Sequence, residues 1–132
     1  MSAENVAVVA AMYAAFARGD INAVLADVDT HVEWRVAENF VYADGNPYIG
    51  RDAVRYGVFG RVPEDWDRYD VHLEEYVDGG ETVVSRGRYI TRHRRTGRVV
   101  DAQFAHVVKL RAGKIVFFQQ YTDTAQFRDA SS

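Results

Sequence analysis

The chain has 132 residues, of which 48% are hydrophobic and 27% charged, and its net charge is −3. This balance excludes a disordered chain, and the slightly acidic character argues against nucleic-acid binding. The absence of cysteine excludes disulfides, thiol nucleophiles and thiolate metal sites, and no apolar run is long enough to cross a bilayer. We therefore expect one domain over residues 1–132, without a signal-peptide pattern and located in the cytoplasm.

Two helices and a strand are predicted at the start of the chain. Apolar residues at helical spacing indicate a first helix between Ser2 and Gly19. Asp20 is placed to cap a second helix. The alternating pattern at 32–36 predicts a short strand with Trp34 on its apolar side.

The remainder begins with a predicted third helix, from Arg51 to Phe59, and is otherwise strand-like. Asp123 is placed to cap a short last helix. Strands linked by hairpin turns are predicted at residues 69–77, 82–91, 99–110 and 115–121. Helices followed by hairpin-linked strands predict an α+β fold, with the helices against one face of a largely antiparallel sheet.

Four stretches of the chain resemble one known group of proteins. They are YAAFARGD (Tyr13 to Asp20), IGRDAV (Ile49 to Val54), FAHVVKLRAGKI (Phe104 to Ile115) and YTDTA (Tyr121 to Ala125). Together they resemble the SnoaL-like and ketosteroid-isomerase-like proteins of the nuclear transport factor 2-like superfamily. The resemblance spans nearly the whole chain. It is specific for fold and weak for function, because this superfamily hosts both enzymes and binding domains.

The resemblance implies a cone-shaped fold. A strongly bent, mixed but mostly antiparallel sheet is wrapped by three helices around a mostly apolar pocket. The implied ligand is a small, hydrophobic, cyclic molecule, and neither a cofactor nor a metal is expected. The four histidines show no metal-ligand spacing, which agrees with the expectation of no metal site.

The resemblance also points to a polar centre of the pocket. His106 aligns with an oxyanion-hole aspartic acid of the steroid isomerase, so His106, Tyr13 and Asp123 are the candidate catalytic residues. Burial should keep the His106 ring neutral at pH 7. Alternation along the strands then directs further residues to the same face. The candidate ligand-binding residues on that face are Trp34, Arg88, Phe104, Phe118 and Gln120, and the other residues expected there are Val84, Arg86, Ile90, Val100, Ala102, Val108 and Val116.

Each of these assignments has a structural alternative. His106 can be a core histidine that is hydrogen-bonded to Gln120 or Tyr13, and Asp123 can be a helix cap. Arg86 and Arg88 need a carboxylate partner if they are buried, or they reach water at the sheet edge. Glu33, Glu38 and Asp101 are the candidate partners.

The sequence departs from the enzymes that it resembles where their chemistry is most demanding. Trp34 occupies the position of the isomerase's catalytic aspartate, and Gln120 that of the cyclases' carboxylate. The isomerase's oxyanion tyrosine falls near Met12, one position from Tyr13. Two functions therefore stay open. One is a cofactor-free isomerase, cyclase or dehydratase acting on a small hydrophobic cyclic substrate, and the other is a binding or dimerisation domain without turnover.

The opposite face of the strands is also rich in apolar residues. An exposed sheet face rarely carries so much apolar surface, and the resemblance suggests sheet-to-sheet pairing. We therefore expect a symmetric homodimer through this outer face. The residues predicted on it are Val83, Ser85, Tyr89, Ala105, Val107, Phe117 and Tyr121.

Overall fold

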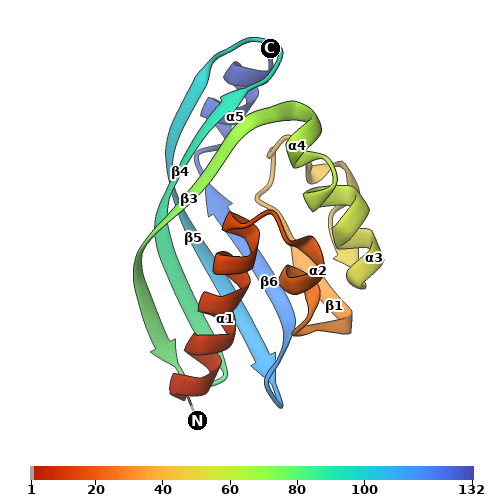
Figure 1. Ribbon diagram of the computed structural model, residues 1–132, viewed down its shortest axis with the longest axis vertical. Helices are drawn as coiled ribbons and strands as arrows, with labels where there is room; N and C mark the ends of the chain where they lie inside the picture. Colours follow the sequence, from red (N-terminus) through yellow and green to blue (C-terminus); the bar gives the residue numbers. More distant parts are fainter. Residues whose placement is uncertain (1) are drawn as a thin grey trace.

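The computed structural model describes residues 2–132 and has an α+β fold (Figure 1). One six-stranded sheet has the order β2-β1-β6-β5-β4-β3. The β1–β6 pair is parallel and the other neighbouring pairs are antiparallel. The strands are β1 (Val28–Arg35), β2 (Tyr48–Ile49), β3 (Trp66–Gly79), β4 (Thr82–His93), β5 (Val99–Arg111) and β6 (Lys114–Thr122). This is the mixed, mostly antiparallel sheet that the sequence predicts.

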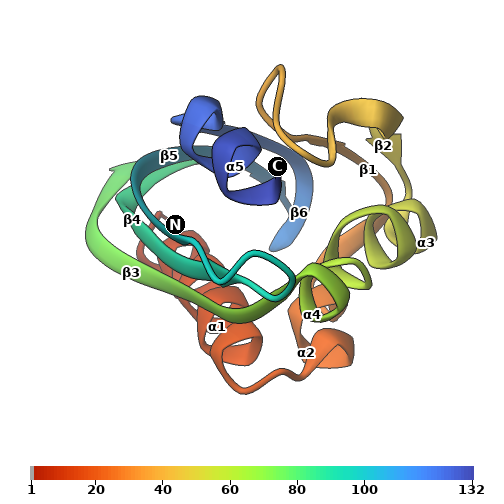
Figure 2. The same cartoon turned by 90° about the horizontal axis from the view of Figure 1, so that it is seen from above.

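The helices lie along the open side of the curved sheet. Seen from above, the sheet bends around the centre of the molecule, with α1 to α4 facing its concave side (Figure 2). The helix α5 lies near one end of the long axis (Figure 1). The cone-shaped fold is thereby confirmed. The helical segments are α1 (Ser2–Ala17), α2 (Ile21–Leu25), η1 (Ala43–Gly45), α3 (Arg51–Val54), η2 (Arg55–Phe59), α4 (Val62–Asp65) and α5 (Thr124–Ser131).

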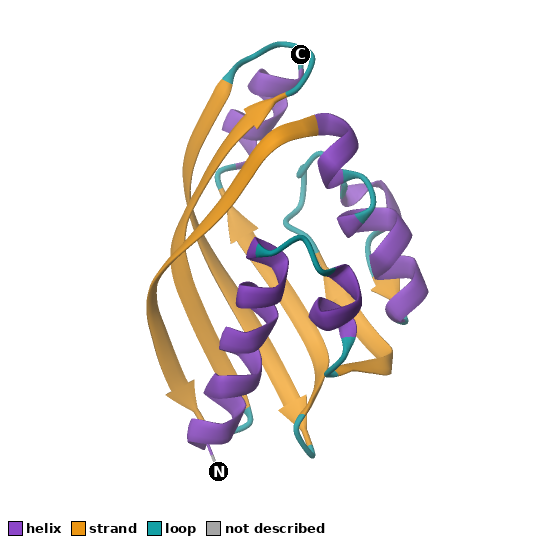
Figure 3. Cartoon of the chain, in the orientation of Figure 1, coloured by secondary structure: helices purple, strands orange, loops and turns teal. Residues whose placement is uncertain are grey.

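Local sequence signals fix several of these boundaries (Figure 3). Gly19 ends α1 with φ of 72°, a left-handed conformation that glycine adopts without strain. Asp20 caps α2, because its carboxylate accepts a hydrogen bond from the Ala23 amide at 3.0 Å. The predicted third helix exists, but its second half is the π-helical segment η2, whose Phe59 faces the interior. The short helix α4 was missed.

The predicted inner face of β4 is wrong by one residue. Ser85 pairs with His106 and Tyr89 with Ala102, so Ser85 and Tyr89 share the buried face of β5. Arg88 therefore lies on the outer face, and so do Val84, Arg86 and Ile90. The physical reason is the cost of burying an arginine, which exceeds the gain from burying its valine and isoleucine neighbours.

The two arginines form ion pairs on the outer face. Arg88 donates from Nε to Asp101 Oδ1 at 2.7 Å, which confirms one of the proposed partners. Arg86 pairs with Glu74 and Glu75 of β3. Both guanidinium groups stay in contact with water, so these pairs contribute little to stability.

A bulge in the β5–β6 ladder contradicts the prediction that Val116 lies on the inner face. The register shifts after Lys109, so that Ile115 is fully buried and Val116 is only partly buried. Phe118 and Gln120 beyond the bulge are buried on the inner face, as predicted.

Within residues 2–132, no helix is long and apolar enough to cross a membrane. The cytoplasmic location stays a prediction.

Candidate ligand-binding site

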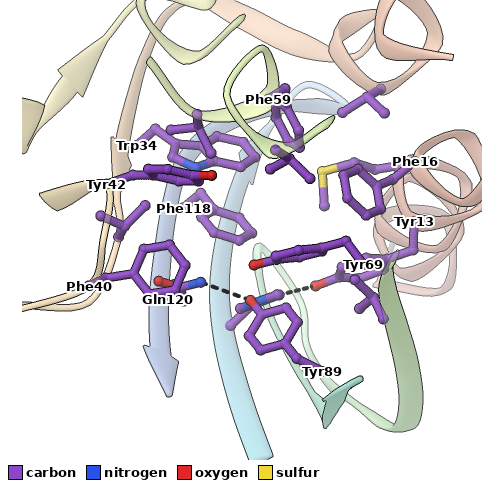
Figure 4. A pocket seen from close by; sticks show the side chains of 17 residues that line it. Tyr13, Phe16, Trp34, Phe40, Tyr42, Phe59, Tyr69, Tyr89, Phe118 and Gln120 are labelled. Atoms are coloured by element: carbon purple, nitrogen blue, oxygen red, sulfur yellow. Dashed lines mark hydrogen bonds between the residues drawn. The ribbon is translucent and has the colours of Figure 1, made fainter. Parts of the chain in front are cut away.

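A cavity of about 70 Å³ lies between the concave face of the sheet and the helices (Figure 4). One water molecule needs roughly 10–15 Å³, so this space is larger than a packing defect. The wall is mostly aromatic and aliphatic. It is formed by Met12, Tyr13, Phe16, Val24, Trp34, Val36, Phe40, Tyr42, Val58, Phe59, Val62, Tyr69, Val71, Tyr89, His106, Phe118 and Gln120.

Stacked aromatic rings form one side of the cavity. Trp34 of β1 and Phe118 of β6 are direct neighbours in the parallel ladder, and their ring centroids lie 3.9 Å apart with an interplanar angle of 9°. Phe59 of η2 packs edge-on against Trp34 at 5.6 Å. Trp34 and Phe118 thus line the cavity, as predicted from strand alternation. The stack makes a flat apolar surface that suits a planar ligand.

The partly exposed residues of the cavity wall lie on α1, η2 and β3. Most of the wall is buried, but five lining residues remain partly exposed to solvent. Phe16 contacts both Phe59 and Tyr69, with centroids 5.7 and 5.9 Å away, so three rings from three elements meet there. The five partly exposed residues are Tyr13, Phe16, Phe59, Tyr69 and Val71. They mark where a ligand could enter.

His106 is held at the cavity wall by two tyrosines. The Tyr13 hydroxyl lies 2.6 Å from Nδ1, and the Tyr89 hydroxyl lies 2.6 Å from Nε2. Burial lowers the pKa of His106 to about 3, so the ring is neutral at pH 7. Phe104 stacks on the imidazole at 4.3 Å and is buried on the inner face, but it is not part of the cavity wall.

The hydrogen bonds of His106 extend across the sheet in both directions. At one end, the Tyr13 hydroxyl lies 2.5 Å from Ser85 Oγ. At the other, Gln120 Nε2 donates to the Tyr89 hydroxyl at 2.9 Å, and Gln120 Oε1 accepts from the Ala37 amide at 3.0 Å. The alternative that His106 bonds to Tyr13 is correct. Its bond to Gln120 is indirect, through Tyr89.

The protons of this network can run in two directions. In one arrangement, Tyr89 donates to Nε2 of His106, and Nδ1 donates through Tyr13 to Ser85. In the other, Ser85 donates through Tyr13 to Nδ1, and the Nε2–H donates to Tyr89. Tyr89 then accepts from both His106 and Gln120, and its own proton is free for an acceptor in the cavity. The tautomer of one imidazole thus decides whether Tyr89 can donate to a ligand.

Besides Phe104, two of the predicted site residues lie outside the cavity wall. Asp123 is the exposed N-terminal capping residue of α5, and its carboxylate accepts from Gln126 Nε2 at 3.0 Å. The prediction that it assists His106 is therefore wrong. Arg88 lies on the outer face, because the register of β4 differs from the predicted one. Conversely, Tyr89 and Ser85 were missed, although the charges of Arg86 and Arg88 on alternate positions could have revealed the correct face.

The cavity holds no ionised group at neutral pH. Among residues 2–132, no aspartate or glutamate contributes to its wall. Burial raises the pKa of Tyr13 and of Tyr89 far above the ordinary value for tyrosine, so both keep their protons. Within the same residues, no cluster of three or more histidine or acidic side chains could hold a metal ion. The wall is equipped to donate hydrogen bonds to a neutral ligand, and it offers no carboxylate base.

Comparisons with known proteins agree with this architecture. A nuclear transport factor 2-like protein from Burkholderia thailandensis is 38% identical, with 97% of each chain covered and a TM-score of 0.91. TerC, crystallised with polyporic acid, is 25% identical over 96% of this chain and 97% of its own, with a TM-score of 0.86. A Xanthomonas campestris protein, proposed to be a polyketide cyclase, is 22% identical over 99% and 98% of the two chains, with a TM-score of 0.83.

A search of proteins with curated functions gives no match. The family comparison is positive, since residues 9–118 match the SnoaL-like domain. This match includes most of α1, the cavity wall on β1, and the whole of β3, β4 and β5. The chain therefore belongs to the SnoaL-like family and has the nuclear transport factor 2-like fold.

Proposed function

We propose that this protein binds a small, neutral, largely apolar cyclic molecule in the aromatic cavity. The observation that carries the proposal is the pairing of aromatic walls with a neutral hydrogen-bond network centred on His106. A charged ligand would lose its hydration and find no counter-charge in the wall, whereas a neutral ring would gain apolar contact. The co-crystallisation of TerC with polyporic acid supports an organic ligand in this fold.

The chemistry that the site supports is polarisation of a ligand oxygen. When Nε2 of His106 carries the hydrogen, Tyr89 has a proton free to donate, and the network behind it strengthens that donation. Donation to a carbonyl stabilises the enolate-like charge that develops in isomerisation, cyclisation and dehydration. We propose such cofactor-free chemistry as the reaction class, with His106 as the residue that orients Tyr89.

Binding without turnover is the second candidate function. It is favoured by the absence of a carboxylate from the cavity wall that residues 2–132 form. A histidine whose pKa is lowered to about 3 is a weak base, so proton abstraction would need a group from the ligand or from solvent. The two candidates share the ligand and differ only in proton transfer.

Ligand binding is tested by titrating a library of small cyclic molecules while recording amide NMR shifts. We expect shifts to cluster at the residues around the cavity. Val71→Trp should block the cavity mouth and weaken binding by at least about tenfold, since an indole cannot fit beside a ligand there. Val77→Trp is the matched control, because Val77 is on the same strand but exposed. Equal binding by both variants would place the ligand elsewhere.

Turnover is tested with the ligands that bind. A cyclic ketone in D₂O exchanges its α-hydrogens when its enol forms, and the exchange is followed by NMR. Catalysis predicts exchange that is faster with the protein and slower with Tyr89→Phe. A bound ketone that exchanges at the solvent rate would support binding without turnover.

We also propose a homodimer through the outer sheet face. The corrected register leaves an apolar strip of Val84, Ala105, Val107, Phe117 and Tyr121 on that face, flanked by the ion pairs of Arg86 and Arg88. Sedimentation should give about twice the chain mass of 14.9 kDa. Val107→Asp should give monomers, whereas Tyr56→Asp, at an exposed residue of η2 away from the sheet, should not. A wild-type monomer at micromolar concentration would contradict this proposal.

A further inference from the structure

The Tyr69 hydroxyl differs from the other tyrosine hydroxyls of the cavity wall. Tyr69 faces inward from β3, where it pairs with the buried Thr91, and its ring forms part of the cavity wall. Figure 4 shows its hydroxyl directed toward the interior of the pocket, between the sheet and α1. Among residues 2–132, no hydrogen-bond partner contacts this hydroxyl. A phenol in apolar surroundings normally finds a partner.

Apart from the indole N–H of Trp34, the other polar side chains of the wall are hydrogen-bonded to each other or to the rest of the protein. Tyr42 donates to Asp65 at 2.8 Å and accepts from Trp66 Nε1 at 3.1 Å. The remaining ones form the network of Tyr13, Tyr89, His106 and Gln120. Within the described wall, Tyr69 therefore has the one hydroxyl whose proton and lone pairs are both uncommitted.

The position of this hydroxyl is set before any ligand arrives. The Tyr69 ring is packed against four others, with Phe16 and Trp66 edge-on at 5.9 and 6.0 Å, and with Tyr89 and Phe127 at 5.5 and 6.3 Å. Burial raises the pKa of Tyr69, with a smaller contribution from Tyr42, so the group stays a protonated donor. A fixed donor costs little conformational entropy when it binds a ligand.

We infer that Tyr69 is the specificity-determining residue of the cavity and selects neutral cyclic ligands that present a carbonyl oxygen to its hydroxyl. This inference rests on the proposed binding function and adds the ligand's functional group. A ring without an acceptor would leave the hydroxyl unpaired, and a carboxylate would bring a charge that no residue of the wall balances. A carbonyl supplies one acceptor with no charge. Its second lone pair can receive the proton of Tyr89, whose ring lies 5.5 Å from that of Tyr69.

The test compares two probes of nearly the same shape, cyclohexanone and methylenecyclohexane. They differ only in that the C=O group of the first is replaced by a C=CH₂ group in the second. Amide NMR titration gives the affinity of each. We expect the wild type to prefer the ketone by about tenfold, the effect of one hydrogen bond. In Tyr69→Phe the preference should vanish or reverse, because the ketone then loses its hydration without a partner, while methylenecyclohexane should bind as before.

The control is Tyr76→Phe, which removes a hydroxyl from the same strand outside the cavity wall and should leave the preference intact. A ketone preference that survives Tyr69→Phe would overturn the inference while leaving the binding function in place. Equal binding of both probes by the wild type would overturn it as well, as would happen if a water molecule held the hydroxyl. Failure of both probes to bind the wild type would contradict the proposed function itself and the inference with it.

Discussion

Lowering the pH from 7 to 4 is expected to cost the wild type about 3 kcal/mol more folding free energy than it costs His106→Gln. In the folded protein, burial lowers the pKa of His106 to about 3 from its ordinary value of 6.5. The unfolded chain takes up the proton near pH 6.5, whereas the folded protein does so only near pH 3. The folding free energy that depends on a neutral His106 is therefore fully present above pH 6.5, and it is lost progressively as the pH falls toward 3.

The magnitude follows from the environment of the ring. The groups that face His106 are Tyr13 from α1, Ser85 and Tyr89 from β4, and Gln120 from β6. None is a carboxylate, so no counter-charge stabilises the imidazolium in this wall. One pKa unit corresponds to about 1.4 kcal/mol, and about 2.5 units separate pH 6.5 from pH 4.

Urea unfolding at a fixed protein concentration and at several pH values measures how the free energy of unfolding depends on pH. The variants are compared by the slope of this free energy against pH. His31→Gln is the control, since it makes the same substitution at a histidine whose side chain is 91% exposed. Ring NMR of the wild type offers an independent readout if His106→Gln folds poorly. A His106 ring that titrates above pH 5 would contradict the assignment of a buried neutral imidazole.

The fold was predictable because its signals are local. Asp20 caps α2 through its own carboxylate, Gly19 supplies a left-handed turn, and strand alternation on β5 and β6 follows from residues spaced two apart. The placement of His106 and Gln120 on one face also follows from alternation. The bulge that displaces Val116 has no comparable signal, since it depends on how two strands fit together.

The site was less predictable because it depends on contacts between distant segments. Because the predicted register of β4 was wrong by one residue, Arg88 was assigned to the inner face in place of Tyr89. The prediction therefore missed a central residue of the hydrogen-bond network. Strand alternation assigned Arg86 and Arg88 to the pocket face, although elementary electrostatics argues against burying them there. The bond from Tyr13 to His106 spans 93 positions in the chain, and the unpaired hydroxyl of Tyr69 becomes visible only when its neighbours are known.

Tyr89→Phe is expected to lower the free energy of unfolding by about 3 kcal/mol. The substitution keeps the ring and its packing but removes the hydroxyl that joins Gln120 Nε2, at 2.9 Å, to His106 Nε2, at 2.6 Å. Both groups are buried, so each would be left without its partner and without water. An unsatisfied buried polar group costs about 1–3 kcal/mol, and here there are two of them.

Tyr69→Phe is the matched control for this experiment, because it makes the same chemical change on the same side of the sheet. Removal of the Tyr69 hydroxyl leaves no protein group without a hydrogen-bond partner. The free energy of unfolding should therefore change by no more than about 0.5 kcal/mol. Urea unfolding of both variants at one protein concentration separates the two cases. Equal losses would show that the hydrogen bonds of the Tyr89 hydroxyl contribute no more to stability than the unpaired hydroxyl of Tyr69 does. A loss confined to Tyr89→Phe would identify Tyr89 as the residue that holds His106 and Gln120 in place at the cavity wall.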